Sequence, residues 1–102
     1  MSESALPETI LQKLQEVFAD YPDLVEVVLY GSYVIGRATP RSDIDLATRG
    51  IPDRYRLGRL ALDLDDLPIP QKCDVQAYED IAYEPLKRHI DERGITIYQK
   101  DT

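Results

Sequence analysis

Residues 25–46 read VEVVLYGSYVIGRATPRSDIDL, and the pattern of this segment is the most informative about the fold. It opens on a valine-rich run, and the chain is predicted to form a buried strand over residues 24–30. Gly31 ends that strand, because glycine permits a sharp turn and lets the backbone come close to a ligand. After a loop, alternating apolar and acidic residues predict a second strand over residues 43–48.

The flanking sequence predicts helices and strands in alternation. Apolar residues at helical spacing predict one helix before this stretch and another after it. The remaining predicted elements are a third strand over residues 72–78, a last helix from Pro85 to about Glu92, and a final strand over residues 95–98. The order predicts an α/β or α+β fold, with a mixed sheet of about four strands and helices packed on it.

Length and charge limit the possible functions. A chain of 102 residues is expected to form one domain over residues 1–102. The formal net charge is -7, and an acidic surface repels nucleic acid, so no direct binding of DNA or RNA is expected. A nucleotide that arrives with metal ions remains compatible with this charge, and so does a basic protein partner.

The sequence also carries no signal for export or membrane insertion. The chain has a single cysteine, so an intrachain disulfide is impossible. The N-terminal residues MSESALPETI lack the basic and apolar regions of a signal peptide, and no apolar run reaches membrane-spanning length. The expected compartment is the cytoplasm, without membrane attachment.

Two aspartates on the second predicted strand are the strongest candidates for chemistry. Asp43 and Asp45 stand at positions i and i+2 and project from the same face of the strand. Two carboxylates aimed at one point favour a hard cation, Mg²⁺ or Mn²⁺. An isolated Asp-x-Asp triplet is more often a solvated strand edge. Here it follows Gly31-Ser32, whose hydroxyl and amides are suited to phosphate, and the combination is typical of phosphoryl or nucleotidyl transfer.

This pattern resembles a known family. Gly31-Ser32, ten residues, and then Asp43-Ile44-Asp45-Leu46 is similar to the signature of the nucleotidyltransferases of the DNA polymerase β superfamily. Ser42 directly before it and the ending Gly94-Ile95-Thr96-Ile97-Tyr98 resemble the branch of minimal nucleotidyltransferases (MNT). The resemblance covers nearly the whole chain and implies the small nucleotidyltransferase fold.

The resemblance also implies a role for each site residue. Asp43, Asp45 and Asp74 would bind two Mg²⁺ ions, with Mn²⁺ as a substitute, and Asp74 would help to deprotonate the acceptor hydroxyl. ATP would be the substrate. The implied nucleotide-binding residues are Gly31, Ser32, Gly36, Arg37 and Ser42. Many relatives carry an arginine where this chain has Ile35, so either Arg37 or Arg41 is expected to supply that charge.

MNT proteins often act as antitoxins paired with a HEPN-domain ribonuclease toxin. The resemblance therefore implies transfer of AMP from ATP to a tyrosine of such a toxin, with release of pyrophosphate. Two alternatives remain open. One is transfer to a small hydroxylated molecule, and the other is a binding module that neutralises its partner by contact alone.

Three further residues attract attention without a role in this scheme. His89 is the only histidine, and core packing or a hydrogen bond is expected for it rather than general-base catalysis. Cys73 neighbours Asp74 on a strand and should face the core. Tyr33 lies in the predicted phosphate loop, where it would either stack on the base or lie at the surface.

Overall fold

A four-stranded mixed sheet lies at the centre of the molecule, which is described here from a computed structural model over residues 6–100. The strand order is β3-β2-β1-β4. β1 is antiparallel to β2 and β4, whereas β2 and β3 are parallel. The strands are β1 (Glu26–Tyr30), β2 (Ile44–Arg49), β3 (Cys73–Ala77) and β4 (Ile95–Gln99). The predicted mixed α+β sheet is confirmed.

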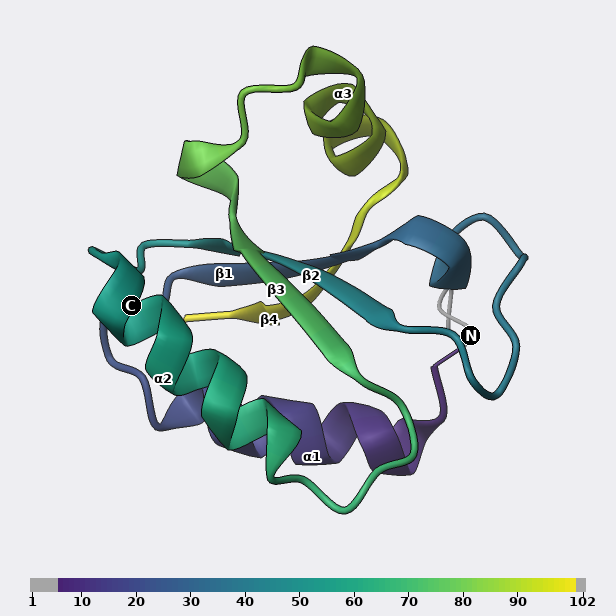
Figure 1. The fold of residues 1–102 in the computed structure, drawn as a ribbon, viewed down its shortest axis with the longest axis horizontal. Helices are drawn as coiled ribbons and strands as arrows, with labels where there is room; N and C mark the ends of the chain where they lie inside the picture. Colours follow the sequence, from purple (N-terminus) through teal and green to yellow (C-terminus); the bar gives the residue numbers. More distant parts are fainter. Residues whose placement is uncertain (1–5, 101–102) are drawn as a thin grey trace.

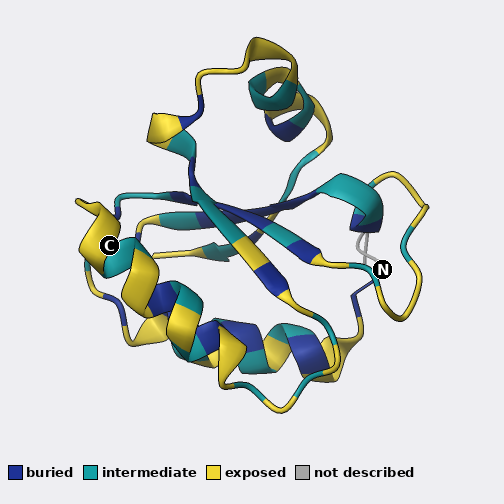
Figure 2. Ribbon diagram, in the orientation of Figure 1, coloured by how far each residue is buried: buried dark blue, intermediate teal, exposed yellow. Residues whose placement is uncertain are grey.

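Two helices cover one face of the sheet (Figure 1). They are α1 (Glu8–Ala19) and α2 (Arg54–Asp65). Ile10, Leu14 and Phe18 recur at every fourth position of α1 and bury one stripe of that helix, as Leu60 and Leu64 do on α2. The buried residues face inward between helices and sheet (Figure 2). This face therefore holds the main core.

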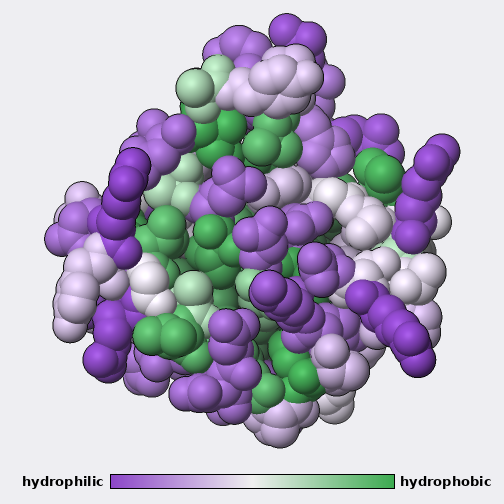
Figure 3. Space-filling model, in the orientation of Figure 1, coloured by the Kyte–Doolittle hydropathy of each residue, from purple (hydrophilic) through white to green (hydrophobic). Residues whose placement is uncertain are grey.

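The third helix, α3 (Glu84–Arg93), packs on the opposite face (Figure 1). A smaller apolar cluster lies beneath it and contains Val28, Tyr30, Ala47, Ile81 and Ile90. Hydrophobic atoms show through at the centre of the view in Figure 3, with hydrophilic side chains around them. Asp74 of β3 is exposed, so α3 leaves part of this sheet face open.

Two short 3₁₀ helices complete the fold, η1 (Gly31–Tyr33) and η2 (Tyr78–Asp80). The first begins at Gly31, directly after β1. The expectation for Tyr33 was wrong in both of its forms, because this residue is 4% exposed and belongs to the main core. Its hydroxyl donates to the carbonyl oxygen of Thr39 and holds the following loop to the body of the protein.

The structure does not describe residues 1–5, so half of the N-terminal segment considered above lies outside it. Within residues 6–100, no helix is long and apolar enough to cross a membrane.

Candidate active site

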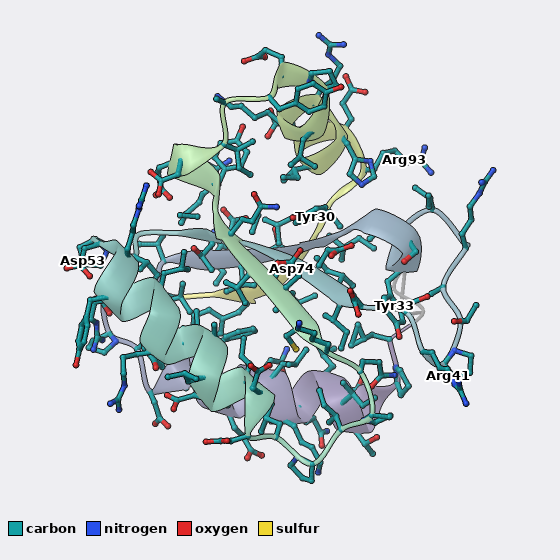
Figure 4. All side chains as sticks on the ribbon, viewed as in Figure 1. Tyr30, Tyr33, Arg41, Asp53, Asp74 and Arg93 are labelled. Atoms are coloured by element: carbon teal, nitrogen blue, oxygen red, sulfur yellow. The ribbon has the colours of Figure 1, made fainter. Side chains whose placement is uncertain are left out.

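The aspartates of the predicted site come from two neighbouring strands. Asp45 of β2 pairs directly with Asp74 of β3 in the parallel register. Residues paired in this way point to the same face, so both carboxylates lie on the side of the sheet that carries α3. Figure 4 shows Asp74 at the centre of that side. Asp43 stands two residues before Asp45, immediately ahead of β2, and is exposed.

The turn after β1 lies against the Asp45 carboxylate. Gly31 has a φ angle of +81°, a conformation that residues with a side chain rarely adopt. A Cβ atom built on Gly31 would also overlap Oδ2 of Asp45. Glycine is therefore required here for two reasons, and its small size lets the loop backbone and the carboxylate meet.

The surroundings of Asp45 disfavour its negative charge. Burial, followed by the charges of Asp74 and Asp43, raises the pKa of Asp45 to about 6. A divalent cation beside these three groups would remove the repulsion between them, and an all-carboxylate donor set fits a hard ion such as Mg²⁺.

The three carboxylates do not form a closed cage. Within residues 6–100, no three side chains of His, Cys, Asp or Glu are gathered as a metal-binding cluster. Asp45 pairs with Asp74 across the two strands and Asp43 stands two residues before Asp45, so the three carboxylates lie in one region of the sheet face. Their closure around a common ion stays a prediction.

The loop between β1 and β2 carries the predicted nucleotide-binding residues. Ser32 is half-buried, and its carbonyl oxygen accepts a hydrogen bond from the amide of Arg37 at 3.1 Å. Gly36 has a φ angle of +76° and open space where a Cβ atom would stand. Arg37 is exposed. These three residues therefore stand on a loop that folds back on itself.

Ser42 and Arg41 stand at the end of the same loop. The Ser42 hydroxyl accepts a hydrogen bond from the amide of Thr39 at 2.8 Å. This hydroxyl therefore stabilises the turn before β2. Arg41 is exposed and extends away from the body of the molecule in Figure 4.

Three residues near the aspartates were missed as parts of the site. Tyr30 of β1 pairs with Asp45, and burial together with Asp45 raises the pKa of its hydroxyl. Gln76 of β3 donates to the Tyr30 hydroxyl at 2.9 Å. His89 of α3 accepts a hydrogen bond from the Gly31 amide at 3.0 Å. The alternation Asp74, Gln76 on β3 was a signal for Gln76, whereas no local signal joins His89 to Gly31.

Solved structures of similar fold place this arrangement among known proteins. A chain from a toxin–antitoxin structure with AMP-PNP is 24% identical, with a TM-score of 0.72 over 88% of this chain and 73% of that one. A chain from a tri-AMPylated Shewanella oneidensis HEPN toxin in complex with an MNT antitoxin is 21% identical, with a TM-score of 0.68 over 91% and 72%. These likenesses establish the fold.

A third structure of similar fold is not described as a toxin–antitoxin structure. It is described as a putative nucleotidyltransferase from Sulfolobus solfataricus, is 18% identical, and gives a TM-score of 0.56 over 88% of this chain and 77% of that one. No curated protein matches the sequence significantly.

The sequence profile described as "Polymerase beta, Nucleotidyltransferase" matches residues 12–102. This span includes the Gly31 turn and all three aspartates, and it covers most of the chain. The family resemblance of the sequence is thereby confirmed, and the protein belongs to the polymerase beta nucleotidyltransferase family.

Proposed function

We propose that this nucleotidyltransferase is an antitoxin that transfers AMP from ATP to a tyrosine hydroxyl of a HEPN-domain toxin. One observation carries the proposal: Asp45 lies beside Asp74 on one sheet face, with the Gly31 backbone against its carboxylate. Phosphate-binding backbone and acidic metal ligands are the two parts that nucleotidyl transfer needs in one place.

Different residues of the chain bind the phosphates, hold the metal ions and accept the proton of the acceptor hydroxyl. Ser32 and the loop that ends at Ser42 bind the β- and γ-phosphates, with Arg37 as the cationic contact. Asp43, Asp45 and Asp74 would hold two divalent ions, Mg²⁺ or Mn²⁺, which would neutralise the charge of the phosphates and of the leaving pyrophosphate. Asp74 orients the acceptor hydroxyl and takes up its proton.

The reaction is a single displacement at the α-phosphorus. The acceptor oxygen forms a bond to this phosphorus while the bond to the β-phosphate oxygen breaks, and pyrophosphate departs. No covalent intermediate with the protein is needed, so catalysis rests on position and electrostatics.

A protein acceptor is supported by the charge and by the neighbours in fold. The net charge of -7 suits a basic partner and disfavours RNA as the acceptor. Two of the similar structures are a toxin–antitoxin pair with AMP-PNP and an AMPylated HEPN toxin with its MNT antitoxin. A HEPN toxin is therefore the proposed partner and ATP the proposed donor.

Co-expression with a HEPN-domain toxin tests the proposal. Intact-mass spectrometry should find the toxin carrying AMP on a tyrosine when the wild-type chain is present, and unmodified toxin with Asp43→Asn/Asp45→Asn. Both forms should fold, since removing two neighbouring like charges relieves repulsion. Unmodified toxin that is fully neutralised by both forms would refute transfer and leave contact alone as the mechanism.

A further inference from the structure

His89 makes a contact that crosses the fold. It is half-buried on α3, and its Nε2 atom accepts a hydrogen bond from the backbone amide of Gly31 at 3.0 Å, across 58 residues of sequence. The imidazole also meets the Tyr30 ring edge to face, with ring centroids 6.0 Å apart. The histidine is thus fixed against the last residue of β1 and the first residue of the turn.

The direction of this hydrogen bond defines the tautomer of the His89 imidazole. Nε2 accepts, so it carries no proton, and the neutral ring holds its proton on Nδ1. The Gly31 amide is the first donor of η1, a position with no partner inside a helix. His89 supplies that partner from another element.

Gly31 is consequently held from two sides. The His89 imidazole binds its amide, and the Asp45 carboxylate lies where a Cβ atom would stand. The helix that carries His89 is itself anchored, because neighbouring Ile90 is buried in the cluster beneath α3 and Asp91 accepts from the Tyr78 hydroxyl. The position of the His89 imidazole is therefore fixed by its own contacts and by the packing of its helix.

We propose that His89 is a positioning residue of the nucleotide-binding turn. Its Nε2 atom fixes the Gly31 backbone, and thereby sets where Ser32 stands relative to Asp45. The Gly31 amide is committed to His89, so phosphate contacts from this turn fall to Ser32. The part of this inference that concerns ATP rests on the proposed function, whereas the part that concerns the turn does not.

Two amide substitutions of different length give a sharp test. In His89→Gln the Oε1 atom is three bonds from Cβ, as Nε2 is in histidine, and it can accept from Gly31. In His89→Asn the acceptor is one bond shorter and falls short. Arg88→Gln, an exposed change on the same helix, controls for loss of helix stability.

Amide hydrogen exchange at Gly31, followed by NMR, reads the contact without nucleotide. Protection should persist in the wild type, His89→Gln and Arg88→Gln, and fall in His89→Asn. Calorimetry with ATP and Mg²⁺ should then show roughly two- to tenfold weaker binding for His89→Asn only, which matches the loss of one hydrogen bond. Equal protection of Gly31 in all four proteins, or unchanged ATP affinity once Gly31 is released, would overturn the proposal.

Two observations distinguish failure of the His89 proposal from failure of the proposed function. Because His89 is the only histidine, its ¹⁵N imidazole chemical shifts in the wild type report directly whether Nε2 is unprotonated. A proton on Nε2 would refute the contact even if a variant failed to fold. Absence of ATP binding by the wild type would defeat the proposed function, while Gly31 exchange would still decide the role of His89 in the turn.

Discussion

Asp45 stands where three unfavourable influences on a carboxylate meet. It is partly buried, it faces Asp74 across the strand pair, and Asp43 lies two residues away. These influences raise its pKa to about 6, from the 3.8 that is usual for an aspartate side chain. A residue placed at such a cost is typical of a site that binds charge, since positions with perturbed pKa values concentrate at functional sites.

Without metal, the contribution of Asp45 to stability should become less favourable as the pH rises from 3.8 to about 6. Between pH 3.8 and about 6, Asp45 keeps a proton in the folded state that the unfolded chain has released, so folding is penalised increasingly as pH increases. Asp45→Asn should therefore stabilise the protein at pH 7.5 and have little effect near pH 3.5. Urea unfolding in EDTA measures the difference, with Glu16→Gln on exposed α1 surface as a control for the loss of one charge. Equal effects of Asp45→Asn at both pH values would contradict the assignment.

The two loop glycines should differ in their tolerance of alanine. Both have positive φ angles, so each substitution costs roughly 1–2 kcal/mol of backbone strain. Gly36 has open space around it, whereas a Cβ atom at Gly31 meets the Asp45 carboxylate. Gly31→Ala should thus lower the free energy of unfolding by more than Gly36→Ala. Chemical denaturation of the two variants side by side provides the measurement, and equal losses would argue against close contact with Asp45.

At the scale of elements, α2 links the two strands that bear the aspartates. It begins after Asp53, whose Oδ1 atom accepts a hydrogen bond from the Arg56 amide at 2.8 Å. This cap satisfies a donor that the first turn of a helix leaves without a partner. The sequence allowed this helix to be predicted from its leucines, but its start was not placed, because the apolar pattern begins later than the cap.

Loss of this cap should weaken the fold without affecting the site directly. Asp53→Ala should reduce the free energy of unfolding by about 1 kcal/mol, while Asp53→Asn, which retains an acceptor oxygen, should lose much less. Thermal unfolding compares the two. Nucleotide affinity, measured where both variants are folded, should equal that of the wild type, because Asp53 lies at the far end of β2 from Asp43. A larger loss for asparagine than for alanine would show that the side-chain acceptor is not what stabilises the helix.

For the whole molecule, the dominant feature is an acidic chain whose most unfavourable carboxylate, that of Asp45, lies on an inner strand of the sheet. Any ion that binds the folded state alone raises the apparent stability. Mg²⁺ or Mn²⁺ should therefore increase the midpoint of thermal unfolding at pH 7.5 in a concentration-dependent way. Asp43→Asn/Asp45→Asn should lose most of this increase.

General screening of the net charge of -7 is the effect to exclude. Sodium chloride at matched ionic strength screens surface charge equally in both proteins, so it provides the control. An increase of the same size from sodium chloride as from Mg²⁺, or one that persists in the double variant, would remove the aspartates from metal binding.

The order of the elements and the faces of the strands could be predicted from local sequence patterns alone. Successive side chains of a strand point to opposite faces of the sheet, and this alternation is a local property. It predicted that Asp43 and Asp45 point away from the face of Ile44. It predicted in the same way that Asp74 points away from the face of Cys73. The core positions of Ile44 and Cys73 confirm these faces. The Gly31-Ser32 and Asp43–Asp45 pattern likewise identified the family, because spacing within a motif needs no knowledge of distant contacts.

Contacts between residues that are distant in the sequence became known from the three-dimensional fold. The pairing of Asp45 with Asp74 depends on β3 joining β2 in parallel at one particular register, which α2 and its loops determine. The burial of Tyr33 follows from the direction of a short helical turn, which composition does not specify. The contact between His89 and Gly31 requires α3 to cross β1, and no periodic pattern in either segment encodes it, because its energy comes from packing between elements that are far apart in the chain.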